Sequence, residues 1–248
     1  MNIIDLTGKS VVITGAGSGI GRETAKVVAQ QGGRALLIDI VSEGLTETMS
    51  ELSGTEHRSY VADLSDLAAL PALIETISFE NGPVSGLVHC AGISSRRPMN
   101  VLKVEPFKKL MDINFHSFVE LVRLFSKRKN FADGGSVVVM SSISSIRGFK
   151  AKTEYCASKA AVDAFVRCAA LELAGRGIRV NSVMPAEVLT PMALRARSIN
   201  DTVNAADFVA PLGPSTPQEV ANTIAFLLSD ATKTISGTSI RIDGGACV

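Results

Sequence analysis

A tyrosine and a lysine stand four residues apart in the stretch TEYCASKAA, and this spacing could do chemistry. Tyr155 and Lys159 would lie on one face of a helix, one turn apart. A phenol and an ammonium that point the same way form either a solvated surface pair or an acid whose pKa the ammonium tunes. The rest of the chain must decide between these two interpretations.

The tuned acid requires a buried pair. A free phenol has a pKa of ~10, which is too high for efficient proton exchange at neutral pH. Lowering that pKa to ~7 needs about 4 kcal/mol of preferential stabilisation of the phenolate. An ammonium about 4 Å away supplies roughly this amount at an effective dielectric constant of ~20, whereas an exposed pair contributes only ~0.2–1 kcal/mol. Tuning of Tyr155 by Lys159 is therefore expected only where the pair is buried in a site.

A glycine-rich stretch, TGAGSGIG, joins an apolar run to a helix-like segment near the N-terminus. Glycines at Gly15, Gly19 and Gly21 permit a tight turn and a close approach of the backbone to a phosphate, which the amides at the next helix start attract. Asp39 ends the following apolar run, where a carboxylate can accept hydrogen bonds from both hydroxyls of an adenosine ribose. Context and spacing together predict dinucleotide binding.

Asp39 also bears on the choice of cofactor. Its carboxylate would repel the 2′-phosphate of NADP, and Ile40 and Val41 offer no cation to offset this repulsion. Arg22 begins the helix and Arg34 begins the second apolar run, so neither is placed where a phosphate clamp is expected. The sequence therefore favours NAD over NADP.

Seven short apolar runs must supply the strands that carry these groups. Continuous apolar strands indicate burial on both faces, hence a parallel sheet with helices on each side. Amphipathic stretches long enough for crossover helices lie between most runs, among them Val101–Lys129 and Thr153–Gly175. The expected strands are Ser10–Thr14, Ala35–Asp39, Arg58–Ala62, Gly86–Cys90, Ser136–Met140, Ile178–Met184 and Thr238–Asp243.

The alternation of strands and helices does not break, and no linker rich in Pro, Gly or Ser divides the chain. We therefore expect one α/β domain over residues 1–248. Residues 190–214 depart from the pattern, with three prolines and mixed polarity after the sixth apolar run. A segment of this length is often a substrate lid, although a surface excursion without a role is the alternative.

Composition excludes several classes of function. Lys and Arg number 25 against 24 Asp and Glu, so no net field recruits nucleic acid or anionic lipid. No apolar run reaches the length of a membrane span, and no signal peptide is evident. Cys90, Cys156, Cys168 and Cys247 are scattered, and with three histidines they show no metal-ligand spacing. No metal is expected, and a reduced cytoplasmic setting is the simplest interpretation.

The chain resembles the short-chain dehydrogenase/reductase family over nearly its whole length. The resemblance rests on motifs that are specific only in combination: Thr14-Gly15-x-x-x-Gly19-x-Gly21, Asp63-Leu64, Ala91-Gly92, Asn114, Ser141-Ser142, Tyr155-x-x-x-Lys159, Pro185 followed by Thr190, and Asp243-Gly244-Gly245. It implies a single Rossmann-type, doubly wound sheet of seven parallel strands with helices on both faces. It also implies hydride transfer between NAD(P) and a secondary alcohol or ketone, and a homotetramer or homodimer.

The resemblance gives each catalytic residue a role. Tyr155 would give a proton to the carbonyl oxygen during reduction and remove it during oxidation, and Ser142 would hydrogen-bond that oxygen. Lys159 would tune Tyr155 and contact the nicotinamide ribose. Asn114 would hold a water that links Lys159 to solvent. Each residue alone would more often be structural, and only their co-occurrence supports these roles.

Expected cofactor contacts come from the glycine loop, the strand ends and the segment after the sixth strand. By the same resemblance, Asp63 would contact adenine and Thr190 would hold the nicotinamide amide. The backbone near Ala91 and Gly92 would line the cofactor. The full expected set is Gly15, Ser18, Gly19, Ile20, Gly21, Asp39, Asp63, Leu64, Ala91, Gly92, Tyr155, Lys159, Pro185, Val188 and Thr190.

Two positions depart from the family pattern. Where the family usually has Asn-Asn-Ala-Gly, this chain has His89-Cys90-Ala91-Gly92, so His89 must replace or lose the hydrogen bonds that brace the sheet. The usual Pro-Gly is here Pro185-Ala186, which restricts the backbone without removing a catalytic group.

The substrate is less well defined. Five cations, Arg96, Arg97, Arg147, Lys150 and Lys152, fall in or near the stretches that would line the pocket, and could select an anion or simply face water. One interpretation is an NAD-dependent dehydrogenase of a small polyol, sugar acid or other secondary alcohol. Another is a 3-oxoacyl-[acyl-carrier-protein] reductase, which Asp39 disfavours because such reductases generally prefer NADPH. A nucleotide-sensing protein without turnover is the third, although such a protein would be expected to lose the catalytic residues.

Overall fold

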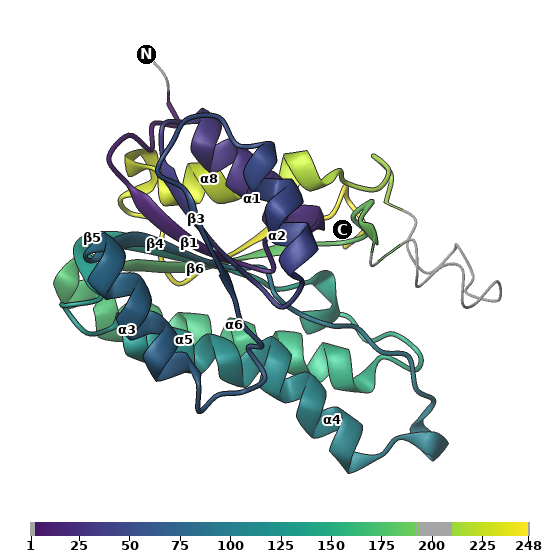
Figure 1. The fold of residues 1–248 in the computed structure, drawn as a ribbon. Coiled ribbons are helices and arrows are strands. Elements are labelled where there is room, and N and C mark those ends of the chain that lie inside the picture. The colour runs from purple at the N-terminus through teal and green to yellow at the C-terminus, as the bar shows by residue number, and fades with distance from the viewer. Residues whose placement is uncertain (1–2, 192, 194–209, 248) are drawn as a thin grey trace.

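Each of the seven apolar runs forms a strand in the computed structural model, which describes residues 3–191, 193 and 210–247. The strands form one parallel sheet in the order β3-β2-β1-β4-β5-β6-β7 (Figure 1). The bounds are β1 Ser10–Thr14, β2 Arg34–Asp39, β3 Arg58–Val61, β4 Val84–His89, β5 Phe131–Met140, β6 Arg179–Pro185 and β7 Ser239–Ile242. The predicted sheet is confirmed, with small differences at the strand ends.

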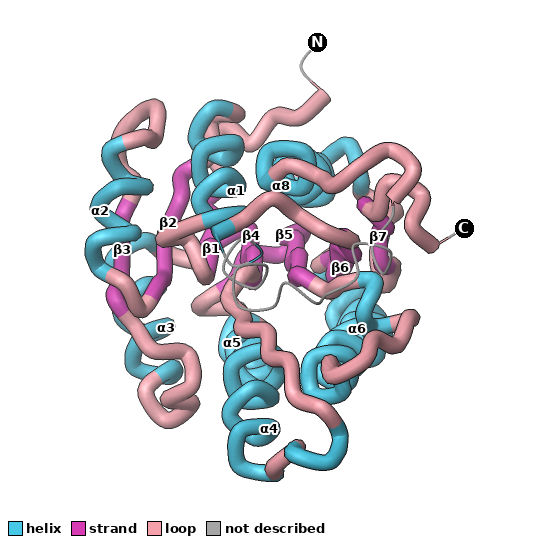
Figure 2. Tube along the Cα trace, turned by 90° about the vertical axis from the view of Figure 1, so that its right-hand side faces the viewer, coloured by secondary structure: helices cyan, strands magenta, loops and turns pink. Residues whose placement is uncertain are grey.

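Helices cover both faces of the sheet, as Figures 1 and 2 show. One face carries α1 (Gly19–Gln30), α2 (Ser42–Ser50) and α8 (Pro217–Leu228). The other carries α3 (Leu70–Asn81), α4 (Val104–Met111), α5 (Ser117–Phe125) and α6 (Thr153–Leu173). This arrangement confirms the Rossmann-type, doubly wound α/β fold, because continuous apolar strands need a helical layer on each side.

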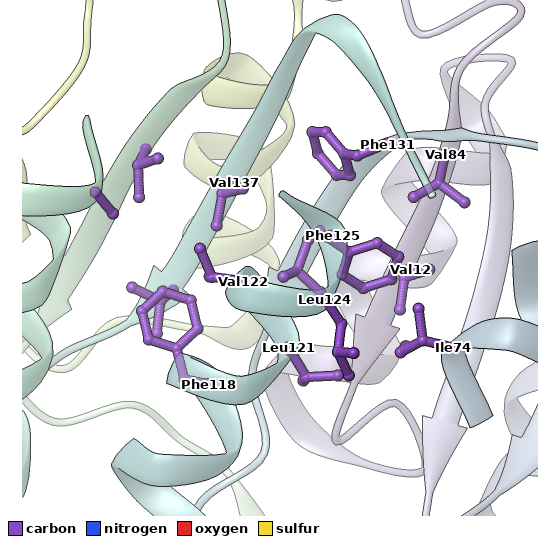
Figure 3. Packing of buried hydrophobic residues seen from close by; sticks show 14 of the residues in the cluster. Val12, Ile74, Val84, Phe118, Leu121, Val122, Leu124, Phe125, Phe131 and Val137 are labelled. Carbon is purple, nitrogen blue, oxygen red and sulfur yellow. The ribbon is translucent and has the colours of Figure 1, made fainter. Parts of the chain in front are cut away.

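Two apolar clusters, one on each face of the sheet, make up the core. The cluster under α3, α5 and α6 is rich in aromatic side chains, and Figure 3 shows Phe118, Phe125 and Phe131 packed beside the strand residues Val12 and Val137. The cluster on the other face joins α1 and α8 to the same strands. The sheet is therefore held rigidly between two layers, and its strand ends are fixed relative to one another.

The expected helix over Val101–Lys129 is not continuous, which corrects that prediction. A 3₁₀ turn at Met99–Val101 precedes α4, and a π-helical turn at Asp112–His116 separates α4 from α5. The π turn accommodates an extra residue in the helix and changes which side chains face the sheet. Asn114 lies in this turn and is fully buried.

The helix expected over Thr153–Gly175 is confirmed by α6 and a following 3₁₀ turn at Ala174–Arg176. Gly177 then ends it with a φ of 66°, a left-handed conformation that glycine adopts readily. Phe118 and Val162 lie in the core of this chain, while Phe115 and Phe165 are only partly buried against that core.

The strand order reverses at β1, which pairs with β2 on one side and β4 on the other. In open parallel sheets, ligands bind outside the carboxyl ends of the strands at such a switch point. Most of the expected lid at 190–214 lies outside the described residues. Within the described part of the chain, no helix is both long and apolar enough to cross a membrane.

Candidate active site

The loop between β1 and α1 packs tightly against the segments that follow β4 and β6. Gly15 has a φ of +66°, and a Cβ atom there would lie 2.8 Å from the backbone nitrogen of Ala91. Gly19 has a φ of +54°, and its Cβ would lie 3.4 Å from the Cγ2 atom of Thr190. A Cβ on Gly21 would collide with the carbonyl oxygen of Gly15. Side chains at these positions would therefore separate three of the segments expected to contact a cofactor.

Helix α1 begins at this loop with its first amides facing the carboxyl end of the sheet. Ser18 is its N-cap residue, and the Ser18 side chain makes no capping hydrogen bond. Gly19, Ile20 and Gly21 form the first turn, where the aligned backbone dipoles favour an anion. A helix start of this kind, reached through a glycine loop, suits a phosphate group.

Asp39, at the end of β2, braces the same loop. One carboxylate oxygen, Oδ2, accepts a hydrogen bond from the backbone nitrogen of Gly17 at 2.9 Å, and Oδ1 accepts one from Val41 at 3.0 Å. A Cβ on Gly17 would lie 3.0 Å from this carboxylate, so the close approach depends on glycine. Each oxygen retains a lone pair that a ribose hydroxyl could use.

Arg22 and Arg34 both make side-chain contacts with other residues of the chain. Arg22 donates to the carbonyl of Gly17 at 2.6 Å and to the carboxylate of Glu47 at 2.7 Å. Arg34 donates to the side chain of Asn81 at 2.5 Å. Arg34 is the first residue of β2, so this contact lies at the opposite end of the strand from the glycine loop. These contacts agree with the expectation that neither arginine clamps a phosphate beside Asp39.

The expected adenine contacts lie at the end of β3. The Asp63 carboxylate accepts hydrogen bonds from the Ser65 hydroxyl at 2.7 Å and the Ser65 backbone nitrogen at 2.8 Å. These bonds lower the pKa of Asp63. Leu64 is buried in the core cluster, so its contribution would come from its backbone.

The segment after β6 approaches the site from the other side of the switch point. Pro185 is the last residue of β6 and pairs with Ile242 of β7. Val188 is buried and forms an isolated bridge with Ser215. The Thr190 backbone nitrogen donates to the Val188 carbonyl at 2.7 Å, which turns Thr190 toward Gly19.

Gly92 brings two expected catalytic groups close together. A Cβ on Gly92 would lie 3.2 Å from the side-chain oxygen of Asn114 and 3.8 Å from the Nζ atom of Lys159. The Asn114 amide nitrogen donates to the Ile93 carbonyl at 2.9 Å and to the Ser158 hydroxyl at 3.1 Å, and its oxygen accepts from the Ile93 nitrogen at 2.8 Å. Asn114 thereby links the π turn, the loop after β4 and α6.

Lys159 is buried and lies on the same face of α6 as Tyr155. Its Nζ atom donates to the carbonyl oxygen of Met140, at the end of β5, at 2.7 Å. The same atom lies 5.6 Å from the centre of the Tyr155 ring. Burial lowers the pKa of Lys159 to about 8, and the carboxylate of Asp163 opposes this shift.

The expected lowering of the Tyr155 pKa is not produced by the chain's own residues. Burial raises the pKa of Tyr155 to about 12, and the Ser142 side chain opposes the rise. Tyr155 keeps some exposed surface, but protein surrounds most of its ring, so desolvation dominates. Ser142 caps a 3₁₀ turn through its hydroxyl, which accepts from Ser144 at 3.1 Å, and therefore holds a fixed position beside the phenol.

His89, at the position where the family usually has asparagine, contacts a hydroxyl with each of its ring nitrogens. Its Nδ1 atom lies 3.0 Å from the Thr14 hydroxyl, which also accepts from the Ala91 nitrogen at 3.2 Å. Its Nε2 atom lies 3.4 Å from the Ser117 hydroxyl, which donates to the Ile113 carbonyl at 2.7 Å. The Ser117 hydroxyl already donates its proton to the Ile113 carbonyl, so the Nε2 atom of His89 must carry the imidazole proton. The Thr14 hydroxyl must then donate to Nδ1. This chain of bonds joins β1 and β4 to the π turn.

The imidazole and the neighbouring thiol stay uncharged. Burial and the Lys159 ammonium lower the pKa of His89 to about 3. Burial raises the pKa of Cys90 to about 12, so this thiol is a packing group and not a nucleophile.

Sequence reasoning missed the buried carboxylate of Asp163. Three serine hydroxyls donate to it: Ser141 at 2.9 Å, Ser182 at 2.7 Å and Ser239 at 3.2 Å. Asp163 follows Lys159 by one helical turn, and this spacing was the available signal.

Glu154, next to Tyr155, was also missed. Its side chain is only 2% exposed and lies in an ion pair with Arg97 at 2.8 Å. The Ser95 hydroxyl donates to the same carboxylate at 2.7 Å. Glu154 therefore ties the loop after β4 to the start of α6, immediately before the expected acid.

Comparisons with known proteins agree with this geometry. The family model described as enoyl-(acyl carrier protein) reductase matches residues 15–247. A D-threitol dehydrogenase from Mycolicibacterium smegmatis is 32% identical, over 97% of this chain and 93% of that protein. The 3-oxoacyl-[acyl-carrier-protein] reductase FabG of Thermotoga maritima is 33% identical, over 98% of this chain and 99% of that protein.

Among solved structures, a variant of the actinorhodin polyketide ketoreductase with NADPH superposes with a TM-score of 0.88. It is 28% identical, and the match covers 96% of this chain and 97% of the ketoreductase. Sheet order, site geometry and these matches over nearly the full length lead to one conclusion: the chain belongs to the short-chain dehydrogenase/reductase family of oxidoreductases.

Proposed function

We propose that the chain works as one catalytic domain that moves a hydride between NAD(H) and a secondary alcohol or ketone, with Tyr155 as general acid and base. The observation that carries the proposal is the convergence of Tyr155, Lys159 and Asn114 beside Gly92, at the carboxyl ends of the central strands. Ser142 lies at the same edge of the sheet, after β5. A nucleotide and a reacting carbonyl could meet at this edge.

The residues present fit a dinucleotide. The glycine loop and the start of α1 would hold the pyrophosphate, because Gly15, Gly19 and Gly21 leave space that side chains would fill. Asp39 would hold the adenosine ribose, and Thr190 would meet the nicotinamide end. When bound, the nicotinamide ring accepts or supplies the hydride and, in its oxidised form, carries a positive charge.

The side chains would divide the proton chemistry among them. Ser142 would donate a hydrogen bond to the substrate oxygen and stabilise the charge that develops there. Tyr155 would give the proton to that oxygen in reduction and take it in oxidation. Because the phenol has a pKa of about 12 with Lys159 already in place, Tyr155 depends on a further positive charge, that of the oxidised nicotinamide, to reach working pH. Lys159 would act together with that charge, and Asn114 would connect Lys159 to solvent.

We further propose a preference for NAD. Asp39 would repel a 2′-phosphate, and Arg22 is committed to Gly17 and Glu47. The structurally similar ketoreductase with NADPH shows that the fold also accommodates the phosphorylated cofactor. The residues around Asp39 must therefore determine which of the two cofactors binds more tightly. Calorimetric titration with both reduced cofactors tests this preference without requiring a substrate.

Two other functions make different predictions. A 3-oxoacyl-[acyl-carrier-protein] reductase, as in the Thermotoga relative, would reduce carrier-bound thioesters, preferably with NADPH. A nucleotide sensor would bind cofactor without turning over any alcohol. A panel of polyols, hydroxy acids, simple secondary alcohols, their ketones and a 3-oxoacyl thioester, assayed with NAD(H) and NADP(H) and followed by the absorbance of the reduced cofactor, separates the three. Absence of turnover with every alcohol and ketone, despite NAD binding, would overturn the proposed reaction.

Assembly as a homotetramer or homodimer remains part of the proposal. Phe115, in the π turn, and Phe165, on α6, are partly buried and could extend to a partner copy. A strictly monomeric mass at micromolar concentration, measured by light scattering, would contradict it.

A further inference from the structure

Gly17, in the middle of the glycine loop, is bound through both of its backbone polar groups by charged side chains. Its carbonyl oxygen accepts a hydrogen bond from the Nη2 atom of Arg22, in the first turn of α1, at 2.6 Å. Its nitrogen donates to the Asp39 carboxylate at 2.9 Å. One peptide segment therefore connects Arg22 to the carboxylate that is expected to accept from the adenosine ribose.

Arg22 also acts on the residue before Gly17. Its Nε atom donates to the Thr48 hydroxyl at 3.1 Å. Thr48 is fully buried in α2, and its hydroxyl lies 2.8 Å from the carbonyl oxygen of Ala16 and 2.9 Å from that of Gly44. Because the hydroxyl oxygen accepts from Arg22, its single proton is directed to these carbonyl groups. Arg22 thus contacts Gly17 directly and acts on Ala16 through Thr48.

Two carboxylates of α2 fix the guanidinium of Arg22. Glu47 lies 2.7 Å from Nη2, and Glu51 lies 3.5 Å from Nη1. Helices α1 and α2 lie side by side on one face of the sheet (Figure 2). The Arg22 side chain is only 21% exposed, so it is enclosed between the two helices and the loop. A planar guanidinium offers five N–H donors in a rigid fork, and one side chain can therefore serve acceptors on the loop and on α2 at once.

A loop rich in glycine needs such support. Glycine loses more backbone freedom on ordering than any other residue, and Gly15, Gly17 and Gly19 all lie in this loop. A loop that is ordered before binding spares the cofactor the entropy cost of ordering it. Without Arg22 the carbonyl of Gly17 would lose its charged donor, and the hydrogen bond from Gly17 to Asp39 would be less well fixed.

We propose that Arg22 is a positioning residue for the cofactor, which sets the glycine loop and the Asp39 carboxylate for the adenosine half of NAD(H). This inference rests on the proposed oxidoreductase function. It gives Arg22 a role toward the cofactor that lacks a 2′-phosphate, through Gly17 and not through contact with the reacting atoms. Loss of Arg22 should therefore lower the affinity for the cofactor without lowering the rate of the chemical step.

The test measures cofactor binding by Arg22→Met, which keeps a long side chain and removes every N–H donor. Calorimetric titration with NADH should give a dissociation constant roughly 5- to 20-fold above that of the wild type, part of the loss expected for charge-assisted hydrogen bonds. Arg22→Lys keeps the charge but serves fewer acceptors, and its affinity should lie between the two. On an alcohol that the wild type oxidises, Arg22→Met should raise KM for NAD by a similar factor and leave kcat at saturating NAD unchanged.

A double-mutant cycle checks that Arg22 acts through the same peptide segment as Asp39. Asp39→Ala removes the acceptor of the Gly17 N–H group, so the loop has already lost one of its two supports in this background. Arg22→Met should then weaken NADH binding by a smaller factor than it does in the wild type. Equal factors in the two backgrounds would overturn this route of action.

Lys26→Met is the matched control. Lys26 lies one turn beyond Arg22 on α1, and its side chain is 25% exposed. Its ion pairs are with Glu23 and with Glu51, which Arg22 also contacts. Lys26→Met should keep the wild-type affinity for NADH, and thermal unfolding without cofactor reports any loss of stability in either variant. A purely structural role for Arg22 predicts fewer folded molecules and a lower apparent kcat, with the dissociation constant and KM unchanged.

The outcomes separate this inference from the proposed function. Wild-type NADH affinity in Arg22→Met, or an equal loss of affinity in Lys26→Met, overturns the positioning role and leaves the oxidoreductase function intact. A lower kcat with unchanged affinity also overturns it. Absence of NAD(H) and NADP(H) binding by the wild type overturns the proposed function, and the positioning role with it.

Discussion

Asp163 lies one turn of α6 beyond Lys159, and its buried carboxylate is held by hydroxyls from three different strand regions. Ser141 follows β5, Ser182 lies in β6 and Ser239 begins β7. The carboxylate therefore cannot turn away from the helix, and it favours the charged form of Lys159. We interpret Asp163 as a residue that favours the ammonium form of Lys159, the lysine that we propose to tune Tyr155.

Asp163→Asn should shift the pH dependence of the reaction. The other groups near the Lys159 ammonium are the His89 imidazole and the Cys90 thiol, both uncharged, and the phenol of Tyr155. Without the carboxylate the Lys159 pKa falls below about 8, so the ammonium is lost at lower pH. The alkaline limb of the kcat profile should then move to lower pH, with a shift of one unit corresponding to about 1.4 kcal/mol.

The control for this variant is Glu172→Gln, which removes an exposed carboxylate from the same helix. It should leave the profile in place. A purely structural role for Asp163 predicts lower rates at every pH with both limbs unmoved.

His89 should make the fold sensitive to acid. Its pKa is about 3 in the folded protein and ~6.5 when unfolded. Between these values only the unfolded chain binds the proton, so the free energy of unfolding falls as the pH drops below ~6.5, by up to about 1.4 kcal/mol per pH unit. His89→Asn should flatten this dependence in urea unfolding at pH values between 7.5 and 5.5. The exposed His116, replaced by Asn, serves as the control, and an unchanged slope in His89→Asn would count against the assignment.

Asp39→Ala should narrow the gap between NADH and NADPH affinity, because it removes both the ribose acceptor and the repulsion of a 2′-phosphate. A tenfold change corresponds to about 1.4 kcal/mol. Adding Glu47→Gln removes one of the two ion pairs of Arg22, the other being with Glu51, and should improve NADPH binding a little further. Calorimetry with both cofactors measures the effect. Equal or tighter NADPH binding by the wild type would contradict the role of Asp39.

The three catalytic substitutions should differ in kind. Tyr155→Phe and Ser142→Ala should keep NAD binding while turnover falls by roughly 10²–10⁴. Lys159→Ala should weaken both, and its residual activity should need higher pH because the phenol then lacks its resident cation. Cofactor titration and kcat on one common substrate provide the data. Near-normal rates in all three variants would contradict the proposed catalytic roles and favour the alternative, in which Tyr155 and Lys159 are a surface pair.

The strands and the glycine loop could be predicted because their signals are local. A continuous apolar run such as Val11–Thr14 is compatible with few structures other than a buried strand. The π turn could not be predicted, because Asp112–His116 has ordinary helical spacing, and the extra residue is stabilised by contacts of Asn114 with distant segments. Tertiary context overrode local periodicity there.

The electrostatics of the site could be predicted only in part. From sequence, Arg97 and Lys152 were equivalent surface cations, and only the fold shows that one neutralises the buried Glu154 while the other lies beside Tyr155. The direction of the Tyr155 pKa shift in the chain alone could not be predicted from sequence either. It depends on the balance between burial and a neighbouring charge, and this balance depends on three-dimensional distances.

The strand order has a consequence for biosynthesis. β1 pairs with β4, and the Asp163 cluster is completed by Ser239 of β7, the last strand of the chain. Pairings between segments so distant in sequence form slowly, since a long loop must close before they gain any contact. A nascent chain on the ribosome can therefore bury its first strands early but cannot complete the support of Lys159 until Ser239 has emerged. Unfinished chains thus lack the complete site.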